Sequence, residues 1–149
     1  MRESIPVDVV NNIISFTDQE IRYRYCFVVN KTHYSNILKS LKTVEGRTAK
    51  KQRTYTNLDE GDIIAFRPGQ AAKIGCFARV TEVRTFPNFR EMIDFFSLNA
   101  CLPNCKTIDE GISIYHSIKN YEKDATNYGV LGIKFELMEF PQKYRKLKT

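Results

Sequence analysis

A strand–turn–strand pattern in the middle of the chain constrains the fold most strongly. Residues 62–67 alternate as a half-buried strand does, and residues 75–85 form a second strand-like segment with Phe77, Val80 and Val83 as expected core positions. Between the two segments, a Pro-Gly pair at 68–69 supplies a turn. Strands joined by so short a connection form an antiparallel hairpin. The pattern therefore argues against an all-parallel, doubly wound sheet.

The other periodic segments are short and of both kinds. Strand-like composition or alternation marks residues 23–29, 43–47 and 129–140. Apolar residues at helical spacing mark residues 5–16, 30–41, 88–96 and 107–119. The last of these helices opens with a capping-box pair, Thr107 and Glu110. Strands separated by short helices predict an α+β protein, a small mixed β-barrel of about five to six strands flanked by helices.

The length of the chain, 149 residues, is that of one domain with one hydrophobic core. We expect residues 1–22 to form an N-terminal helical extension, residues 23–140 the domain, and residues 141–149 a basic tail. The longest apolar runs fall far short of the roughly 20 residues of a membrane span, and the N-terminus lacks a signal-peptide pattern. We therefore expect a cytoplasmic or nuclear protein that is not secreted, with its four cysteines as free thiols.

Positive charge is concentrated in one part of the chain. The net charge is +6, and residues 39–53 contain six basic side chains and one acid, Glu45. The same region leads into a polar segment, residues 48–60, which has neither helical nor strand periodicity and is predicted to be a long surface loop. A basic balance of this kind favours a polyanionic partner.

Two sequence blocks resemble a known family. Residues 42–47, KTVEGR, have the form K-x-x-E-x-R, and residues 61–66, GDIIAF, have the form G-D-x-I-x-F. Both blocks are similar to the motif of the ASCH domain, and the likeness continues in order over about residues 25–138. The resemblance implies a PUA-like β-barrel flanked by helices, with a cleft lined by the K-x-x-E-x-R residues.

The extended segment around Glu45 indicates what this cleft would bind. Side chains alternate along a strand, so Glu45 and Arg47 share one side and can pair, whereas Lys42 is expected on the other. A carboxylate held by arginine stays ionised and can accept hydrogen bonds from the exocyclic amine of a base. Arg47 or Arg53 could hold a phosphate through two parallel bonds. We therefore expect an RNA-binding module that recognises a nucleotide or a modified base in a basic cleft.

Aromatic side chains near these segments are candidates for stacking on an unpaired base. Tyr55 and Tyr128 are favoured because their neighbours are polar and their hydroxyls need a partner. The complete set of predicted RNA-binding residues is Lys42, Thr43, Glu45, Arg47, Lys50, Lys51, Arg53, Tyr55, Arg67 and Tyr128.

An enzyme is the main alternative. Some small ASCH proteins hydrolyse the acetyl amide of N4-acetylcytidine with a Lys, a Thr three residues later and a downstream Glu. Lys42 matches the lysine, but the position three residues on is Glu45, and no acid occupies the later position near Asn104. Thr43 faces away from Lys42 on an extended chain and is a poor substitute for the hydroxyl. An amidohydrolase of this kind would use Lys42 and Glu45.

Two further alternatives come from other classes of protein. A ribonuclease would cut single-stranded RNA, although no cluster of carboxylates indicates the metal site that such an enzyme often uses. An adaptor would recruit a protein partner through residues 5–16, which resemble the opening helix of an F-box. The two histidines and the single close cysteine pair, residues 101 and 105, do not form a zinc pattern, and the glycines do not form a nucleotide loop. No metal or cofactor is expected.

Overall fold

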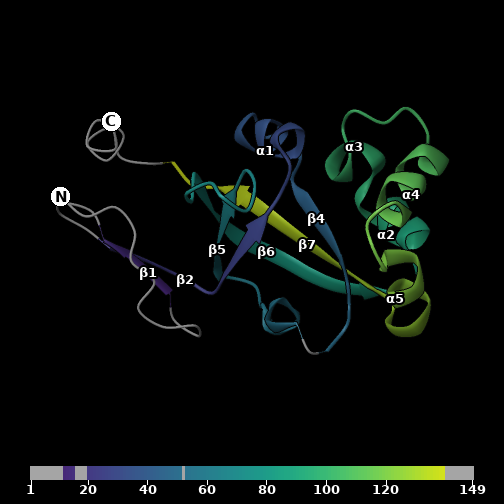
Figure 1. Ribbon diagram of the computed structural model, residues 1–149, viewed down its shortest axis with the longest axis horizontal. Helices are drawn as coiled ribbons and strands as arrows, with labels where there is room; N and C mark the ends of the chain where they lie inside the picture. The colour runs from purple at the N-terminus through teal and green to yellow at the C-terminus, as the bar shows by residue number, and fades with distance from the viewer. Residues whose placement is uncertain (1–11, 16–19, 52, 140–149) are drawn as a thin grey trace.

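The computed structural model describes residues 12–15, 20–51 and 53–139 (Figure 1). Its main sheet has five strands in the order β3-β5-β6-β7-β4. Their bounds are β3 (Tyr25–Val28), β4 (Val44–Thr48), β5 (Ile63–Arg67), β6 (Cys76–Phe86) and β7 (Val130–Leu137). β3 runs parallel to β5, and the other neighbours are antiparallel. A separate two-stranded sheet pairs β1 (Asn12–Ser15) with β2 (Glu20–Tyr23).

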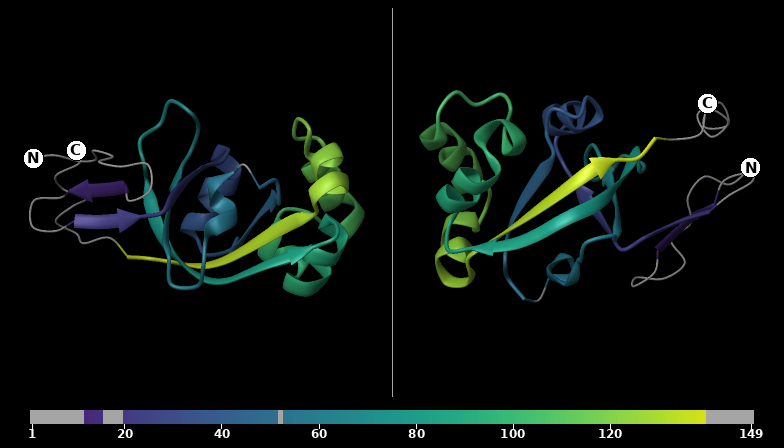
Figure 2. Two further views of the ribbon diagram at one scale, coloured as in Figure 1. Left: turned by 90° about the horizontal axis from the view of Figure 1, so that it is seen from below. Right: turned by 180° about the vertical axis from the view of Figure 1, so that it is seen from behind.

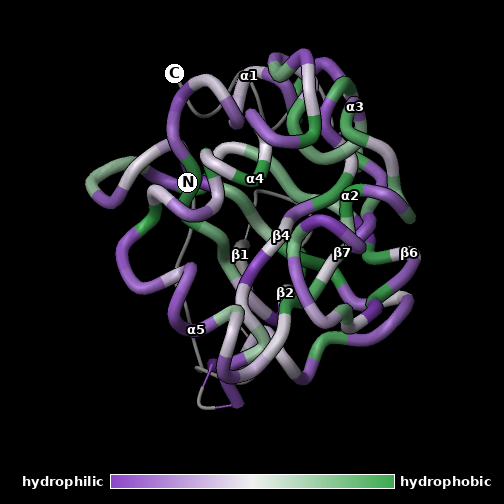
Figure 3. The backbone as a smooth tube through the Cα atoms, turned by 90° about the vertical axis from the view of Figure 1, so that its right-hand side faces the viewer, coloured by the Kyte–Doolittle hydropathy of each residue, from purple (hydrophilic) through white to green (hydrophobic). Residues whose placement is uncertain are grey.

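The main sheet curls into a half-barrel around its long strands (Figure 2). β6 and β7 pair along most of their length, with a register shift between Val80 and Glu82 that adds local twist and bend. The concave side holds the larger hydrophobic cluster, whose largest members include Phe27, Phe66 and Phe135. Figure 3 shows hydrophobic residues along the central strands and hydrophilic segments mainly in the peripheral loops.

Four of the helices gather at one end of the sheet, on the right in Figure 1. They are α2 (Phe89–Phe96), α3 (Leu98–Cys101), α4 (Ile108–His116) and α5 (Tyr121–Tyr128). They enclose a second hydrophobic cluster, which includes Val44 of β4, Met92 of α2 and Tyr115 of α4. The remaining α-helix, α1 (Lys31–Leu38), connects β3 to β4. None of the helices in the described ranges is long and apolar enough to cross a membrane.

The structure confirms the predicted α+β class and the small mixed barrel flanked by helices. The predicted hairpin is the antiparallel pair β5 and β6. The predicted cap at Thr107 is present, because Thr107 accepts from the backbone N–H of Glu110 at the start of α4. At the start of α1, Asn30 accepts from the backbone N–H of His33 in the same way.

The N-terminal helix prediction is wrong where the structure tests it. Residues 12–15 form strand β1 instead, and residues 5–11 and 16 lie outside the described residues. Ile13 and Ile14 are β-branched and suit a strand as well as one helix face, so short apolar spacing did not separate the two. The strand β2 crosses the predicted boundary between residues 22 and 23. The strand at residues 12–15 also counts against an F-box-like helix over residues 5–16, whereas a protein partner for this segment stays a prediction.

The predicted surface loop is shorter and more structured than expected. Its first residue, Thr48, ends β4, and a 3-10 helix, η1 (Thr54–Asn57), follows. Tyr55 and Leu58 are each only 4% exposed and pack into the larger cluster. The basic stretch between β4 and η1 remains on the surface, as do Asp59 and Glu60 after η1.

Candidate functional site

Strand β4 places an acid and an arginine together. Glu45 and Arg47 are two residues apart, so their side chains project from the same face of the strand. The Arg47 Nε donates to Glu45 Oε2 at 2.8 Å. This pairing is the one that strand alternation predicts. β4 is held in register by β7, with Glu45 opposite Ile133 and Arg47 opposite Leu131.

Lys42 joins the same cluster, contrary to the expectation that it would face away from Glu45. Its Nζ lies 3.7 Å from Glu45 Oε1 and donates to the backbone carbonyls of Val44 and Cys101. The expectation failed because β4 begins only at Val44, so alternation does not extend to Lys42. The ammonium instead ties the start of β4 to helix α3.

The three charged groups are buried or nearly so. Lys42 is 2% exposed and Glu45 is 7% exposed. Burial alone would raise the pKa of Glu45, but Arg47 and Lys42 together hold this pKa below its ordinary value. Burial lowers the pKa of Lys42, and the Glu45 carboxylate opposes that shift. The carboxylate is therefore ionised, and two cations against one anion make the cluster net positive.

Arg47 also bridges the two edges of the sheet. Its Nη2 donates to the Val28 carbonyl on β3 at 3.2 Å, and its guanidinium lies 4.8 Å from the centre of the Phe27 ring. β3 and β4 are the outer strands of the five-stranded order and do not pair with each other. A side chain thus spans the gap that the curled sheet leaves open.

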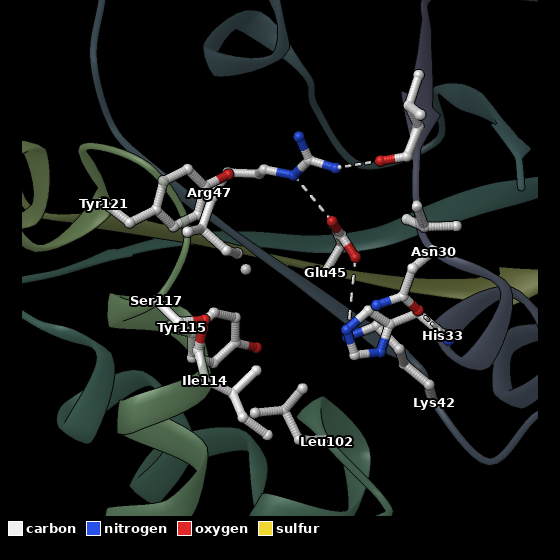
Figure 4. Close-up of a pocket in the computed structure, with 14 residues that line it drawn as sticks. Asn30, His33, Lys42, Glu45, Arg47, Leu102, Ile114, Tyr115, Ser117 and Tyr121 are labelled. Carbon is white, nitrogen blue, oxygen red and sulfur yellow. Dashed lines mark hydrogen bonds and ion pairs between the residues drawn. The ribbon is translucent and has the colours of Figure 1, made fainter. Parts of the chain in front are cut away.

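A cleft of about 270 Å³ lies at this gap, between the sheet edges and helices α4 and α5 (Figure 4). Charged groups line its sheet side, and mainly apolar and aromatic groups line its helical side. Its lining residues are Val28, Val29, Asn30, His33, Lys42, Glu45, Gly46, Arg47, Leu102, Ile114, Tyr115, Ser117, Ile118 and Tyr121.

Two polar atoms of residues that line the cleft are buried without a hydrogen-bond partner among the described residues. They are the Tyr115 hydroxyl and His33 Nδ1. The Tyr115 hydroxyl can approach β4 closely because residue 46 is glycine, where an added Cβ would lie 3.0 Å from that hydroxyl. Burial lowers the pKa of His33, with Lys42 and Arg47 acting in the same direction and Glu45 opposing them. Buried groups left unpaired are costly, so a ligand that paired with them would be favoured.

A stack of three rings holds the helical side in place. The Phe89 ring is stacked with those of both Tyr115 and Tyr121, with ring centres 4.2 Å and 6.0 Å away and planes within 7° of parallel. Burial raises the pKa of Tyr121 to about 12, although Arg47 opposes that shift. Both tyrosines line the cleft, so the stack fixes two of its aromatic surfaces.

Three predicted site residues lie elsewhere. The Tyr55 side chain is in the core, where its hydroxyl donates to the Thr48 carbonyl at 2.8 Å, so it cannot stack on a base. Arg67 does not line the cleft, and its Nη2 donates to Gln70 at 3.3 Å. Thr43 borders a neighbouring hollow with Lys42 and not the cleft.

The remaining predicted residues lie beyond the end of β4 and on α5. Lys51 and Arg53 are exposed, and the Lys50 ammonium lies 6.0 Å from the centre of the Tyr128 ring. Tyr128 is 45% exposed. These four residues form a basic surface with one accessible aromatic ring, outside the cleft itself.

For several residues that line the cleft, no motif or spacing in the sequence predicted a place at the site. His33, Tyr115 and Tyr121 come from α1, α4 and α5, far from Glu45 along the chain. Asn30 caps α1, and that role positions the first turn of the helix, which carries His33. Within the described ranges, no three histidine, cysteine or acidic residues come together as metal ligands. The four cysteines are free thiols.

Comparison with known proteins supports the fold. No family model matches the chain, and no curated protein matches it. The crystal structure of hypothetical protein PH0355 is similar, with 25% identity and a TM-score of 0.66 over 76% of this chain and 98% of that chain. The solution NMR structure of protein PF0455 from Pyrococcus furiosus is also similar, with 28% identity and a TM-score of 0.61 over 78% of this chain and 98% of that chain.

Proposed function

We propose that this chain is an RNA-binding protein of the ASCH, PUA-like type whose cleft takes one base of a single-stranded RNA. The observation that carries the proposal is the Glu45 carboxylate, which is buried and kept ionised by Lys42 and Arg47 beside a cleft of about 270 Å³. The ASCH-like K-x-x-E-x-R block supports the proposal because its three charged residues form this cluster.

The cleft has the chemistry to read the edge of a base. An ionised carboxylate only accepts hydrogen bonds, so Glu45 selects a ligand that presents an N–H, such as the exocyclic amine of cytosine. The Tyr115 hydroxyl and His33 Nδ1 add groups that still need partners. Together they offer a mixed donor and acceptor pattern, which an amino-bearing base can match.

The size and walls of the cleft suit a planar ring. Its volume is slightly below the roughly 300 Å³ at which pockets for drug-sized ligands begin, so one base or nucleoside is the appropriate size. Leu102, Ile114 and Ile118 provide an apolar wall opposite the charged cluster. A base could lay its face on this wall while its edge meets Glu45.

The basic surface provides a place for the RNA backbone. Lys50, Lys51 and Arg53 follow directly after β4, the strand that carries Glu45 and Arg47. Phosphate contacts of this kind give affinity and orientation, whereas contacts to the base give specificity.

Hydrolysis of an N4-acylated cytidine is the second candidate, because Lys42 and Glu45 both line the cleft and burial lowers the pKa of Lys42. The geometry supports it less well. The Lys42 ammonium is already engaged by two backbone carbonyls, and Thr43 does not line the cleft. Release of acetate from N4-acetylcytidine, lost in Lys42→Ala, would favour this enzyme over the binding module.

The proposal is tested by titrating the protein with the common ribonucleosides and with short single-stranded RNA. We expect amino-bearing bases to bind more tightly than uracil by roughly 1–3 kcal/mol, the usual value of a good base contact. Glu45→Gln should reduce that preference more than it reduces overall affinity. The matched control, Glu136→Gln, changes an exposed acid on β7 and should leave the preference unchanged.

The proposal is wrong if neither nucleosides nor RNA bind to a protein shown to be folded by circular dichroism. An equal loss of affinity for every base in Glu45→Gln would refute the reading role of Glu45.

A further inference from the structure

A second hollow of about 230 Å³ adjoins the cleft. The two share the lining residues Asn30, His33, Leu102 and Ile114, so they lie side by side. The second hollow extends between α1 and the segment that joins α3 to α4. We refer to this second hollow as the annex, and the lining residues that it does not share with the cleft are Thr32, Asn36, Pro103, Asn104 and Cys105.

The annex differs from the cleft in charge. Lysine, arginine, aspartate and glutamate are all absent from its lining, whereas Lys42, Glu45 and Arg47 line the cleft. His33 is the one titratable imidazole at the boundary, and burial lowers its pKa, which favours the neutral ring at neutral pH. A phosphate placed in the annex would lose hydration without gaining a cation. The annex is therefore suited to an uncharged group.

Two of its polar groups are side-chain amides that bond to each other. The Asn36 Nδ2 donates to Asn104 Oδ1 at 3.2 Å. This bond leaves the side-chain oxygen Oδ1 of Asn36 able to accept a hydrogen bond from a ligand. It also leaves the side-chain amide nitrogen Nδ2 of Asn104 able to donate one. Asparagine reads base edges in this way, as in its paired bonds to adenine.

The apolar side chains of the annex can pack against the flat face of a ring. Leu102, Pro103 and Ile114 line the annex alongside the amides. A ribose has hydroxyls around its ring and would set several of them against these apolar side chains. A base has two apolar faces and a polar edge, so it matches both parts of the lining.

We infer that the annex is a second base site and that the cleft and annex together bind two adjacent nucleotides of an RNA strand. The inference rests on the proposed function, since it requires that the cleft take the first base. The charged cleft would read one base through a carboxylate, and the uncharged annex would read its neighbour through amides. The smallest complete ligand would be a dinucleotide.

The experiment compares ligands of increasing size by isothermal titration of the full chain. The probes are cytidine and the other common ribonucleosides, all dinucleoside monophosphates built from them, and an analogue of the tightest dinucleotide that lacks the second base. We expect the tightest dinucleotide to bind about tenfold more tightly than the better of its two nucleosides. The analogue without the second base should lose this gain.

Variants locate the gain in the annex. Asn104 is exposed, so Asn104→Ala should keep the fold, although it removes the hydrogen bond from Asn36. It should return dinucleotide affinity to the nucleoside level and leave nucleoside affinity unchanged. Thr32→Leu, which fills the annex from an exposed position on α1, should have the same effect. The control is Asn99→Ala, the same change at an exposed asparagine of α3 that lines neither hollow.

The outcomes separate this inference from the proposed function. If nucleosides bind but no dinucleotide binds more tightly, the second base site is refuted and the cleft assignment stands. If the analogue without the second base keeps the full gain, the annex holds sugar or phosphate and the inference is again refuted. If no nucleoside or dinucleotide binds at all, the proposed function itself fails.

Discussion

Tyr115 illustrates, at the scale of a residue, how a binding site can oppose stability. Its hydroxyl is buried without a partner among the described residues, which stabilises nothing in the free protein. Tyr115→Phe should therefore leave the free energy of unfolding unchanged or raise it by up to about 1 kcal/mol. The same variant should bind nucleosides about five- to tenfold more weakly, because one neutral hydrogen bond is lost. Urea unfolding and titration calorimetry measure the two effects.

Tyr55→Phe is the matched control for that prediction. The Tyr55 hydroxyl does have a partner, the Thr48 carbonyl at 2.8 Å, and it lies outside the cleft. Its removal should lower the free energy of unfolding by about 0.5–1.5 kcal/mol and leave nucleoside affinity unchanged. A reversal of this pattern, with Tyr115→Phe the less stable variant, would show that the Tyr115 hydroxyl has a structural role.

His33 should make stability depend on pH. Its pKa is lowered in the folded protein by burial, Lys42 and Arg47, with Glu45 opposing. Between that lowered value and the ordinary value of about 6.5, the unfolded chain binds a proton that the folded protein does not. Stability should therefore fall as the pH decreases through this window. The Glu45 carboxyl, whose pKa is also lowered, loses its contribution only at more acidic pH.

The measurement is urea unfolding of the wild-type protein and of His33→Gln at about pH 7.5 and about pH 5.5. The variant should show the smaller decrease in unfolding free energy between the two values. His116→Gln, at the other histidine and outside the cleft, is the matched control. An unchanged pH dependence in His33→Gln would contradict the prediction.

At the scale of elements, two helix caps have the same chemistry and different positions. Asn30 caps α1 beside the cleft, and Asn88 caps α2 by accepting from the Glu91 backbone N–H. Replacing either by alanine should lower the free energy of unfolding by about 1 kcal/mol. Only Asn30→Ala should also weaken nucleoside binding, because its cap fixes the first turn that carries His33. Equal affinities in the two variants would show that the cap does not position the site.

The helix α5 was not predicted from the periodicity of its sequence. Its sequence, YEKDATNY, is largely polar, and Ala125 is its one buried residue. A helix anchored by so few apolar residues has no clear helical period, so the sequence did not predict it. It nevertheless carries Tyr121 into the cleft, and it ends at Gly129, whose φ of +79° favours glycine.

At the scale of the whole molecule, the distribution of charge should control RNA affinity. If the backbone lies on the basic surface, affinity for single-stranded RNA should fall steeply with salt. Replacing Lys50, Lys51 and Arg53 together by alanine should reduce the slope of log affinity against log salt by about 2. Replacing Lys106, Lys123 and Lys134, which are exposed and line no part of the cleft, removes the same charge. If this control flattened the slope equally, net charge and not the basic surface would explain the affinity.

Several features of this protein could be predicted from short stretches of its sequence alone. The hairpin of β5 and β6, the cap at Thr107, and the pair of Glu45 and Arg47 each depend on residues close together in sequence. Alternation along a strand and capping at a helix start are set by backbone geometry, so a short stretch of sequence contains the whole signal. The same reasoning failed for Lys42, where the strand had not yet begun.

Contacts between distant segments could not be inferred in this way. His33, Tyr115 and Tyr121 line the same cleft as Glu45 because the sheet curls and the helices pack at one end. The spacing of apolar residues within one helix does not indicate which strand that helix will pack against. Tyr55 was expected at the surface because its neighbours are polar, but its ring packs against Tyr25 and Phe27. The residues that carry charge were thus evident from the chain, whereas the hollow that makes them a site arises from long-range packing.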